Sequence, residues 1–198
     1  MTTDTRRLIL EHNYAAMRRH GFQGVRADKE VTALGITKGA LYYHFADKKA
    51  LGYAVVEEMI APHYLSVWAP LLDGETPVVA HIVRVLEQFK AHATDKEIAL
   101  GCPLNNLIQE MSPLDEGFRQ RLGDVVDGMH TALRTGLERA QATGEVTPLV
   151  DPSATAWFLL SSIEGAYGIA KVRQSRAIFV KSINHLAGYV RQLQIADA

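Results

Sequence analysis

The stretch Gly35-Ile36-Thr37-Lys38-Gly39-Ala40-Leu41-Tyr42-Tyr43-His44-Phe45 decides how the first part of this 198-residue chain folds. Thr37 is a good N-cap for a short helix over 38–45, because its hydroxyl can accept a hydrogen bond from a backbone N–H of the first turn. Leu41 and Phe45 fall one turn apart and face inward. The polar and aromatic side chains between them are therefore expected to face outward.

A second short helix is predicted just before this stretch. Ala27, Val31 and Leu34 are spaced by four and three residues, which indicates a helix over 28–34 that the glycine of the following turn ends. An amphipathic helix over 5–20 precedes both. Two short helices joined by a glycine-containing turn are the ingredients of a helix-turn-helix, so we expect an N-terminal three-helix DNA-binding domain.

The second of the paired helices offers the groups that DNA binding requires. Thr37 and Lys38 at its start supply backbone N–H groups, a hydroxyl and a cation for phosphates. Gly39 and Ala40 are small enough to let the helix enter a major groove. The predicted DNA-binding residues are Arg26, Thr37, Lys38, Gly39, Ala40, Tyr42, Tyr43, His44 and Lys48.

Together with Asp47-Lys48-Lys49-Ala50-Leu51, the quoted stretch resembles the recognition-helix signature of the TetR/AcrR (tetracycline-repressor) family, Ser/Thr-Lys-Gly-x-Leu-Tyr-x-His-Phe followed by Lys-x-x-Leu. The motif-level resemblance covers about residues 5–56, and the remainder matches in length and helical layout. It implies a homodimeric bacterial transcription repressor that binds a pseudo-palindromic double-stranded DNA operator. It also implies release by a small-molecule effector and a dimer interface formed by the last two long helices.

Two positions depart from the family pattern. Val25-Arg26 stands where a Thr or Ser is usual, and Arg26 could replace a hydroxyl contact to phosphate with an ionic one. Glu30 stands in place of a buried Ile, which is unfavourable for the packing of the second helix and, if it faces phosphate, for DNA binding. A family member that has lost specific DNA binding is therefore a second interpretation.

The whole chain is predicted to be all-α. Apolar residues recur every three or four positions almost throughout, and alternation of period two is absent. We expect a DNA-binding domain at 1–50 and a helical effector-binding and dimerisation domain at 51–198. About nine helices are expected, at 5–20, 28–34, 38–45, 47–62, 76–93, 102–111, 113–142, 152–172 and 175–194.

Two of the later helices carry start signals in the sequence. Ser112-Pro113-Leu114-Asp115 combines an N-cap serine, a proline at the first helical position and an acid at the third. Asp151-Pro152 repeats the pattern of a capping side chain followed by proline. The sequence therefore predicts that helices begin at Pro113 and at Pro152.

Cys102 is the most informative residue of the predicted C-terminal domain. Pro103 suits the first position of a helix, which makes Cys102 the N-cap at the positive end of the helix dipole, where the pKa of a thiol tends to fall. The segment resembles a Gly-Cys segment of electrophile- and oxidant-responsive family members, in which this cysteine and a lysine comparable to Lys171 are implicated in sensing. The alternative is a half-buried thiol that lines a pocket without reacting.

Further effector ligands are sought among apolar walls that carry a few polar groups, which is the usual composition of a small-molecule site. The predicted effector-binding residues are Phe89, Cys102, Asn105, Asn106, Met129, Trp157, Glu164, Tyr167 and Lys171. The amides and the carboxylate are favoured, because a buried polar group needs a partner.

The charge distribution supports a DNA partner. Residues 1–53 hold nine Lys or Arg and five Asp or Glu, while the remainder holds 12 and 17, although the net charge is only −1. A basic N-terminal quarter on an acidic body suits an oriented contact with phosphates. The sequence has no apolar run of membrane length and no signal peptide, so a cytoplasmic protein that makes no membrane contact is expected.

Enzymatic and metal-binding functions find little support in the residues. The single cysteine excludes an intramolecular disulfide, and the eight histidines are scattered, so neither metal nor cofactor is expected. Phosphate-loop, dinucleotide and nucleophile–base–acid motifs are absent. The remaining alternative class is an all-helical small-molecule carrier or thiol enzyme that uses Cys102 without specific DNA binding.

Overall fold

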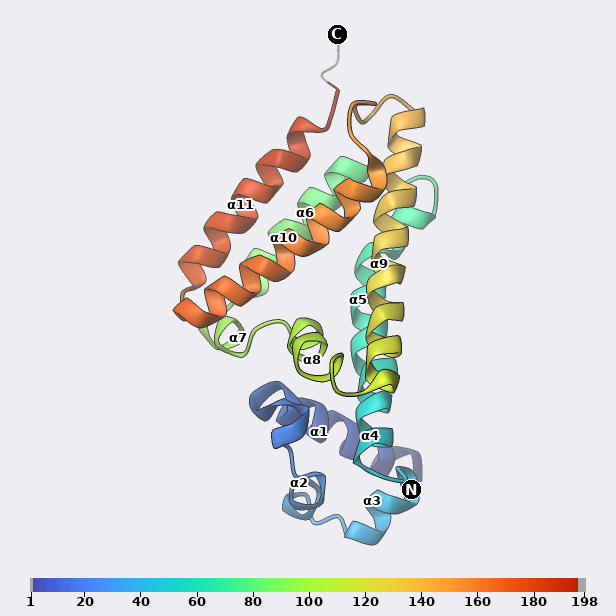
Figure 1. Cartoon of the computed structure of the whole chain (residues 1–198), viewed down its shortest axis with the longest axis vertical. Coiled ribbons are helices and arrows are strands. Elements are labelled where there is room, and N and C mark those ends of the chain that lie inside the picture. Colours follow the sequence, from blue (N-terminus) through green and yellow to red (C-terminus); the bar gives the residue numbers. More distant parts are fainter. Residues whose placement is uncertain (1, 196–198) are drawn as a thin grey trace. The chain divides into compact units, whose positions relative to one another are not determined.

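The computed structural model describes residues 2–195, with side chains from residue 5 onward, and confirms the all-α class (Figure 1). The α-helices are α1 (Thr2–Gly24), α2 (Ala27–Ala33), α3 (Lys38–His44), α4 (Lys48–Val55), α5 (Ala61–Trp68), α6 (Val78–His92), α7 (Asp95–Leu100), α8 (Pro103–Met111), α9 (Glu116–Ala142), α10 (Pro152–Arg173) and α11 (Arg176–Gln192). A π-helical segment η1 (Val56–Ile60) and a 3₁₀ turn η2 (Ala69–Leu72) complete the set. Among the described residues, no helix combines the length and apolar character that a membrane span requires.

The chain forms two compact units. The N-terminal unit contains residues 2–63 and 103–125, and the C-terminal unit contains residues 64–102 and 126–195. Helices α1 and α4, on either side of the helix-turn-helix, thus pack with α8 and the first part of α9, which come much later in the sequence. The expected DNA-binding domain at 1–50 therefore lies inside a larger packing unit. Each unit is described by itself below.

An aromatic cluster forms the core of the N-terminal unit. Phe118 of α9 is fully buried, and its ring meets Phe22 at 4.7 Å and Tyr53 at 4.9 Å between centroids, both edge to face. Gly52 of α4 lies directly against this cluster, since a Cβ built there would be 2.5 Å from both Phe118 and Phe22. The cluster joins α1, α4 and α9, and only glycine fits at position 52.

Helix α1 is kinked at Gly21, which has a φ of 70°. The kink exposes a new set of backbone donors, and the Glu110 carboxylate of α8 accepts from the N–H groups of Phe22 and Gln23, both at 2.8 Å. A Cβ at position 21 would lie 2.8 Å from that carboxylate. Glycine therefore serves two purposes here: it adopts the left-handed backbone and leaves room for Glu110.

The helix that begins after Asp47 continues beyond Pro62, where the sequence analysis ended it. α4 is followed without a break by η1 and α5, and the chain stays helical to Trp68. Proline cannot donate to the carbonyl four residues earlier and its ring crowds that carbonyl. The wider π turn just before it, in which the Ala61 N–H bonds to the Val56 carbonyl, accommodates the proline.

The predicted start of α9 at Pro113 is wrong. Ser112, Pro113 and Leu114 form a turn, and the helix begins at Glu116 with Asp115 as its capping residue, which accepts from the Phe118 N–H at 3.0 Å. Asp115 caps the helix in place of Ser112 because it also accepts a hydrogen bond from the Tyr53 hydroxyl at 2.6 Å. Local sequence patterns do not contain this tertiary contact.

The other capping signals are borne out. Asp151 accepts from the Ala154 N–H at 2.6 Å at the start of α10, and Asp47 accepts from the Ala50 N–H at 2.7 Å at the start of α4. One short helix, α7, was not anticipated; Thr94 caps it by accepting from the Glu97 N–H at 3.2 Å.

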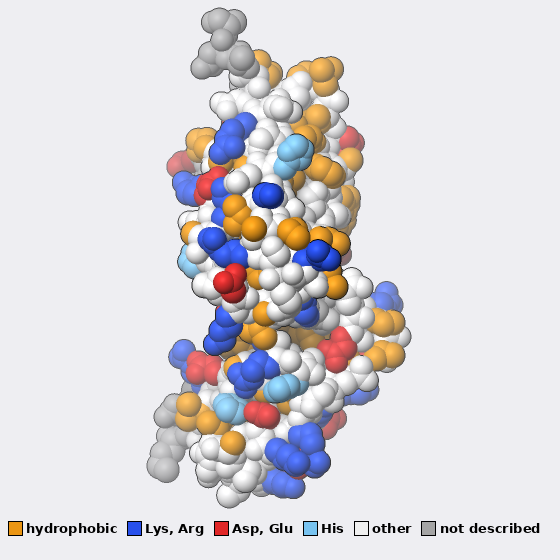
Figure 2. All heavy atoms as spheres, turned by 90° about the vertical axis from the view of Figure 1, so that its left-hand side faces the viewer, with side chains coloured by type: hydrophobic (Ala, Val, Ile, Leu, Met, Phe, Trp, Pro, Cys, Tyr) orange, Lys and Arg blue, Asp and Glu red, His pale blue; other side chains and the backbone are white. Residues whose placement is uncertain are grey.

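The C-terminal unit is built on α11 packed against α6 and α10, with α7 against α10. Its fully buried side chains include Leu86 and Phe179. Helix α10 also exposes large apolar side chains, and Figure 2 shows apolar side chains (orange) on this unit's surface. These exposed residues of α10 are Trp157, Phe158, Ile169 and Val172.

Replacing Gly52 by alanine tests the aromatic cluster. The added methyl group would overlap Phe118 and Phe22, and we expect the free energy of unfolding to fall by about 1–3 kcal/mol. Gly123 of α9 is the matched control, since a Cβ there meets nothing within 4 Å. Gly123→Ala should stabilise by about 0.5–1 kcal/mol through helix propensity. Equal effects of the two changes in denaturant unfolding would contradict the packing assigned to Gly52.

Candidate functional site

The turn between α2 and α3 is a specific helix-ending structure. Gly35 has a φ of 72°, and the N–H of Gly35 bonds to the Thr32 carbonyl while the N–H of Ile36 bonds to the Val31 carbonyl, both at 3.0 Å. These two bonds are those of a Schellman motif, which needs a left-handed residue at this position. The motif stops α2 abruptly and directs the chain into α3.

Helix α3 presents the side chains that the sequence assigned to DNA. The Thr37 hydroxyl caps it by accepting from the Ala40 N–H at 3.2 Å. Leu41 faces the core with 2% of its surface exposed. Tyr42 and Tyr43 are 54% and 77% exposed, which is unusual for side chains of this size unless they serve an interface.

Two exposed cations lie beside the start of α3. Lys38 Nζ is 3.1 Å from Asp28 Oδ2 and Arg26 Nη2 is 3.5 Å from the same oxygen. The hydrogen bond from Lys38 is the main reason that the pKa of Asp28 lies below its ordinary value. Because one carboxylate faces two cations, this cluster keeps a net positive charge. Figure 2 shows Lys and Arg side chains (blue) gathered on the surface of this unit.

Lys48 and His44 are less accessible than the sequence suggested. Lys48 Nζ donates to the Gln23 carbonyl at 3.1 Å and lies 4.8 Å above the Phe22 ring, and burial lowers its pKa. His44 is half-buried, with its ring edge to face against Tyr43 at 5.1 Å. Lys48 thus holds α4 against α1, and a phosphate contact by this residue remains a prediction.

Glu30 has a partner where the sequence analysis expected poor packing. His12 Nε2 of α1 lies 2.9 Å from Glu30 Oε2 of α2, and both side chains are half-buried. A His–Glu pair therefore occupies the place that a buried Ile fills in the family pattern. Glu30 is directed at His12, although His12 Nε2 has no partner in hydrogen-bond geometry among the described residues.

A second cluster surrounds Cys102 in the C-terminal unit. Cys102 is 3% exposed, and its sulfur lies 3.0 Å from the Tyr64 hydroxyl of α5 and 3.3 Å from Glu164 Oε1 of α10. Cys102 directly precedes α8, as predicted. The other Glu164 oxygen, Oε2, is buried and has no hydrogen-bond partner among the described residues.

The environment of Glu164 changes its protonation. Burial raises the pKa of Glu164 from 4.5 to about 7, and the hydrogen bond from Cys102 opposes this only in part. A carboxyl group poised near neutrality beside a thiol is typical of functional sites. Of the nine predicted effector ligands, the structure brings Cys102 and Glu164 into direct contact.

The remaining predicted effector ligands of this unit differ in their exposure. Met129 is buried, Phe89 and Lys171 are half-buried, and Tyr167 packs on Phe179 at 4.4 Å between ring centroids. Trp157 is 41% exposed and stacks on His130 at 3.9 Å, so it belongs to the outer surface of this protomer.

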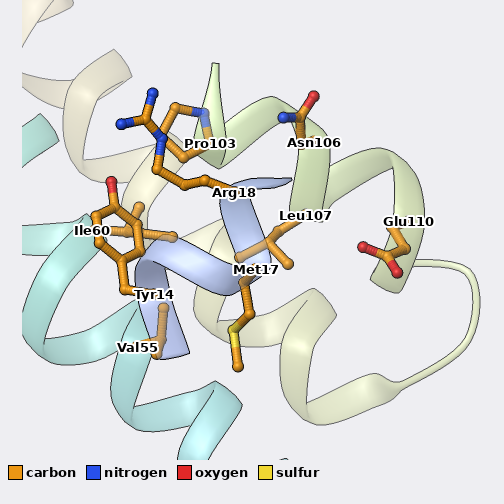
Figure 3. Close-up of a pocket in the computed structure, with 9 residues that line it drawn as sticks. All are labelled: Tyr14, Met17, Arg18, Val55, Ile60, Pro103, Asn106, Leu107 and Glu110. Carbon is orange, nitrogen blue, oxygen red and sulfur yellow. The ribbon is translucent and has the colours of Figure 1, made fainter. Parts of the chain in front are cut away.

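Asn105 and Asn106 lie on α8 and belong to the N-terminal unit. Asn106 lines a small cavity there with Tyr14, Met17 and Glu110 among others (Figure 3). The cavity measures about 10 Å³, which is room for about one water molecule. It does not fit an effector, so a ligand role of these amides stays a prediction.

Sequence reasoning missed Tyr64, the second residue in contact with Cys102. The helix that carries it was expected to end near Pro62, and the π turn that extends it leaves no pattern in the sequence. His130 was also missed, although its ring stacks on Trp157. His130 and Trp157 lie on different helices, so the spacing of residues in the sequence does not predict that their rings stack.

Comparisons with known proteins agree with this geometry. Residues 9–55 match the family of bacterial regulatory proteins of the tetR family, and residues 78–186 match the tetracyclin repressor-like C-terminal domain. The transcriptional repressor DhaR of Mycobacterium sp. (strain GP1) is 25% identical, over 88% of this chain and 86% of its own length.

Two solved structures are also similar. A TetR regulator from Chloroflexus aurantiacus is 26% identical with a TM-score of 0.82, covering 98% of this chain and 97% of its own. The reduced form of E. coli NemR, 24% identical, shares the fold with a TM-score of 0.82 over 98% and 99% of the two chains.

An exposed helix that follows a left-handed turn, in an all-helical chain, defines a helix-turn-helix DNA-binding protein. The family models extend this over most of the sequence, and the C-terminal model alone spans more than half of it. The chain belongs to the TetR family of bacterial transcriptional regulators.

Replacing Glu164 by glutamine tests the burial of its charge. Below pH 4.5 the Glu164 carboxyl is neutral in both the folded and the unfolded protein. Between pH 4.5 and about 7 it ionises only in the unfolded protein, so the free energy of unfolding falls as pH rises and stays reduced above pH 7. Relative to pH 5, Glu164→Gln should gain about 2.5 kcal/mol over wild type at pH 8. Denaturant unfolding at one protein concentration measures this. The exposed change Glu138→Gln is the control, and a pH-independent difference for Glu164→Gln would contradict the assignment.

Proposed function

We propose that this protein is a cytoplasmic, homodimeric transcriptional repressor that binds a pseudo-palindromic operator and is released by a small-molecule effector acting at the Cys102 cluster. The observation that carries the DNA-binding part is the surface of α3. One face of α3 takes no part in the core. This face carries the capped N-terminus and two exposed tyrosines, and cations lie beside it. Such a face fits the major groove, with cations placed for phosphates.

The homodimer is supported by α10. Four large apolar side chains of this helix are exposed, with Val172 at 75% and Ile169 at 58%. An apolar face of this kind on a single protomer is typical of a protein–protein interface. A second copy of the same face would cover it by two-fold symmetry, which also matches a pseudo-palindromic DNA site.

The effector part rests on Cys102, Tyr64 and Glu164. The buried thiol lies 3.0 Å from a hydroxyl and 3.3 Å from a carboxyl group, so three polar side chains converge at one point of an otherwise apolar core. We propose that the effector is an electrophile or oxidant that modifies the sulfur. Glu164 of α10 contacts the sulfur, and Lys171 lies two helical turns further on, about 10 Å along the α10 axis.

Gel-shift titration with DNA from the protein's own promoter tests the reading surface. Lys38→Ala should weaken binding and reduce the salt dependence by about one unit per protomer, because one phosphate contact is lost. Tyr43→Ala should weaken binding with little change of salt dependence. Lys96→Ala, an exposed lysine of α7, is the control. Wild-type affinity for the Lys38 and Tyr43 variants, or the absence of specific binding by wild type, would contradict the proposal and favour a carrier or thiol enzyme.

Release of the same DNA tests the effector site. N-ethylmaleimide, a small thiol-reactive electrophile, should lower the affinity of wild type for its promoter by about tenfold or more, a coupling of the size usual for allosteric proteins. Cys102→Ser should bind DNA as wild type does and ignore the reagent, since Cys102 is the single cysteine. Equal release of both proteins would contradict action at Cys102, and no release of either would leave a repressor with a noncovalent effector.

A further inference from the structure

The proton positions around Cys102 follow from the two short contacts. A thiol carries one proton, and the sulfur donates it to Glu164 Oε1 at 3.3 Å. In the 3.0 Å contact with Tyr64 either atom can be the donor, and when the thiol proton is directed at Glu164 the phenol hydroxyl is the one that donates to the sulfur. The sulfur therefore lies between a proton acceptor on one side and a hydrogen-bond donor on the other.

We propose that Glu164 is the proton acceptor that activates Cys102 towards soft electrophiles, and that Tyr64 stabilises the thiolate as it forms. A nucleophile within hydrogen-bond reach of a base is the structural signature of an activated side chain. The buried Glu164 Oε2, without a hydrogen-bond partner among the described residues, is a second observation pointing to the same site. This inference rests on the proposed effector site and assigns its chemistry.

The reaction is addition to an activated alkene such as an α,β-unsaturated carbonyl compound. Sγ of Cys102 forms a bond to one alkene carbon as the S–H bond breaks, and the proton passes to Glu164 Oε1. The alkene electron pair moves toward the carbonyl group. The proton held by Glu164 then returns to the other alkene carbon, so the thioether product contains all atoms of both reactants and Glu164 is regenerated.

The 3.3 Å contact assigns the thiol proton to Glu164 Oε1, and other charged or titratable groups belong to the same helix and to the elements packed on it. On its own helix the next cation of the same stripe is Lys171, two turns away. From α5 and the α7–α8 connection come Tyr64 and Cys102, and α7 itself, packed on α10, carries Asp95, Lys96 and Glu97. Burial is the main influence on the pKa of Glu164 at about 7, so the carboxylate form is populated at neutral pH.

The experiment measures the rate of Cys102 alkylation by N-ethylmaleimide from pH 5.5 to 9, followed by mass spectrometry on the full-length protein. The single cysteine makes the mass change specific for this site. In wild type the rate should rise with a midpoint near pH 7 as Glu164 ionises. In Glu164→Gln the rate at pH 7 should fall about tenfold or more and follow an ordinary thiol with a pKa of about 8.5.

Tyr64→Phe is the second variant. Removing the hydroxyl should lower the rate at every pH while the midpoint near pH 7 is kept, because Glu164 still accepts the proton. If a substitution only changed how easily the reagent reaches the buried sulfur, the alkylation rate would change by the same factor at every pH. The shift in the midpoint of the pH profile expected for Glu164→Gln would then be absent. The rate in guanidinium chloride, where the thiol of each variant is exposed, gives the reference, and circular dichroism checks that each variant is folded.

Three results would overturn the inference. Superimposable pH profiles of wild type and Glu164→Gln would show that the carboxyl plays no part. A faster reaction of Glu164→Gln would show that Glu164 withholds the proton instead of accepting it. No alkylation of folded wild type between pH 6 and 9 would show that the sulfur is inert. Because alkylation is measured without DNA, a failure of promoter release with normal Glu164-dependent alkylation would reject only the proposed effector function.

Discussion

The Asp115 carboxylate is the interaction on which the N-terminal unit depends. It caps α9 through the Phe118 N–H, accepts from Tyr53 at 2.6 Å and pairs with Lys49 at 2.8 Å. These contacts hold the pKa of Asp115 far below its usual range. With the carboxylate in place, Phe118 enters the aromatic cluster beside Gly52, and α4, which follows the recognition helix directly, is fixed to α9.

Much of the fold could be predicted from the sequence, because most helix boundaries here are decided by local chemistry. Thr37, Asp47 and Asp151 all cap as expected, since a side-chain oxygen and an N–H three residues later lie within one turn. The predicted helix boundaries were wrong at two places where nearby sequence does not determine them. Asp115 caps α9 in place of Ser112 because it also binds Tyr53, and Pro62 did not end its helix because a π turn precedes it.

The candidate sites divide in the same way. Most of the predicted DNA-binding residues are consecutive along one short helix, so periodicity distinguished the buried Leu41 from the exposed Tyr43. The predicted effector residues come from several helices that are distant in the sequence, and burial of an amide or aromatic side chain does not show what it faces. Cys102 and Glu164 were both selected from the sequence, but their contact and the role of Tyr64 needed the structure.

The proposed effector site and the DNA-binding helices are joined by a short stretch of the chain. Cys102 is joined by one peptide bond to Pro103, where α8 begins, and Glu110 near the other end of α8 binds the backbone of α1 at its kink. Lys48 binds the carbonyl of the same kink and begins the helix after the recognition helix. An effector changes DNA affinity only if it binds two arrangements of the protein unequally. Helix α8 begins at the residue after Cys102 in the chain and contacts α1 within the N-terminal unit.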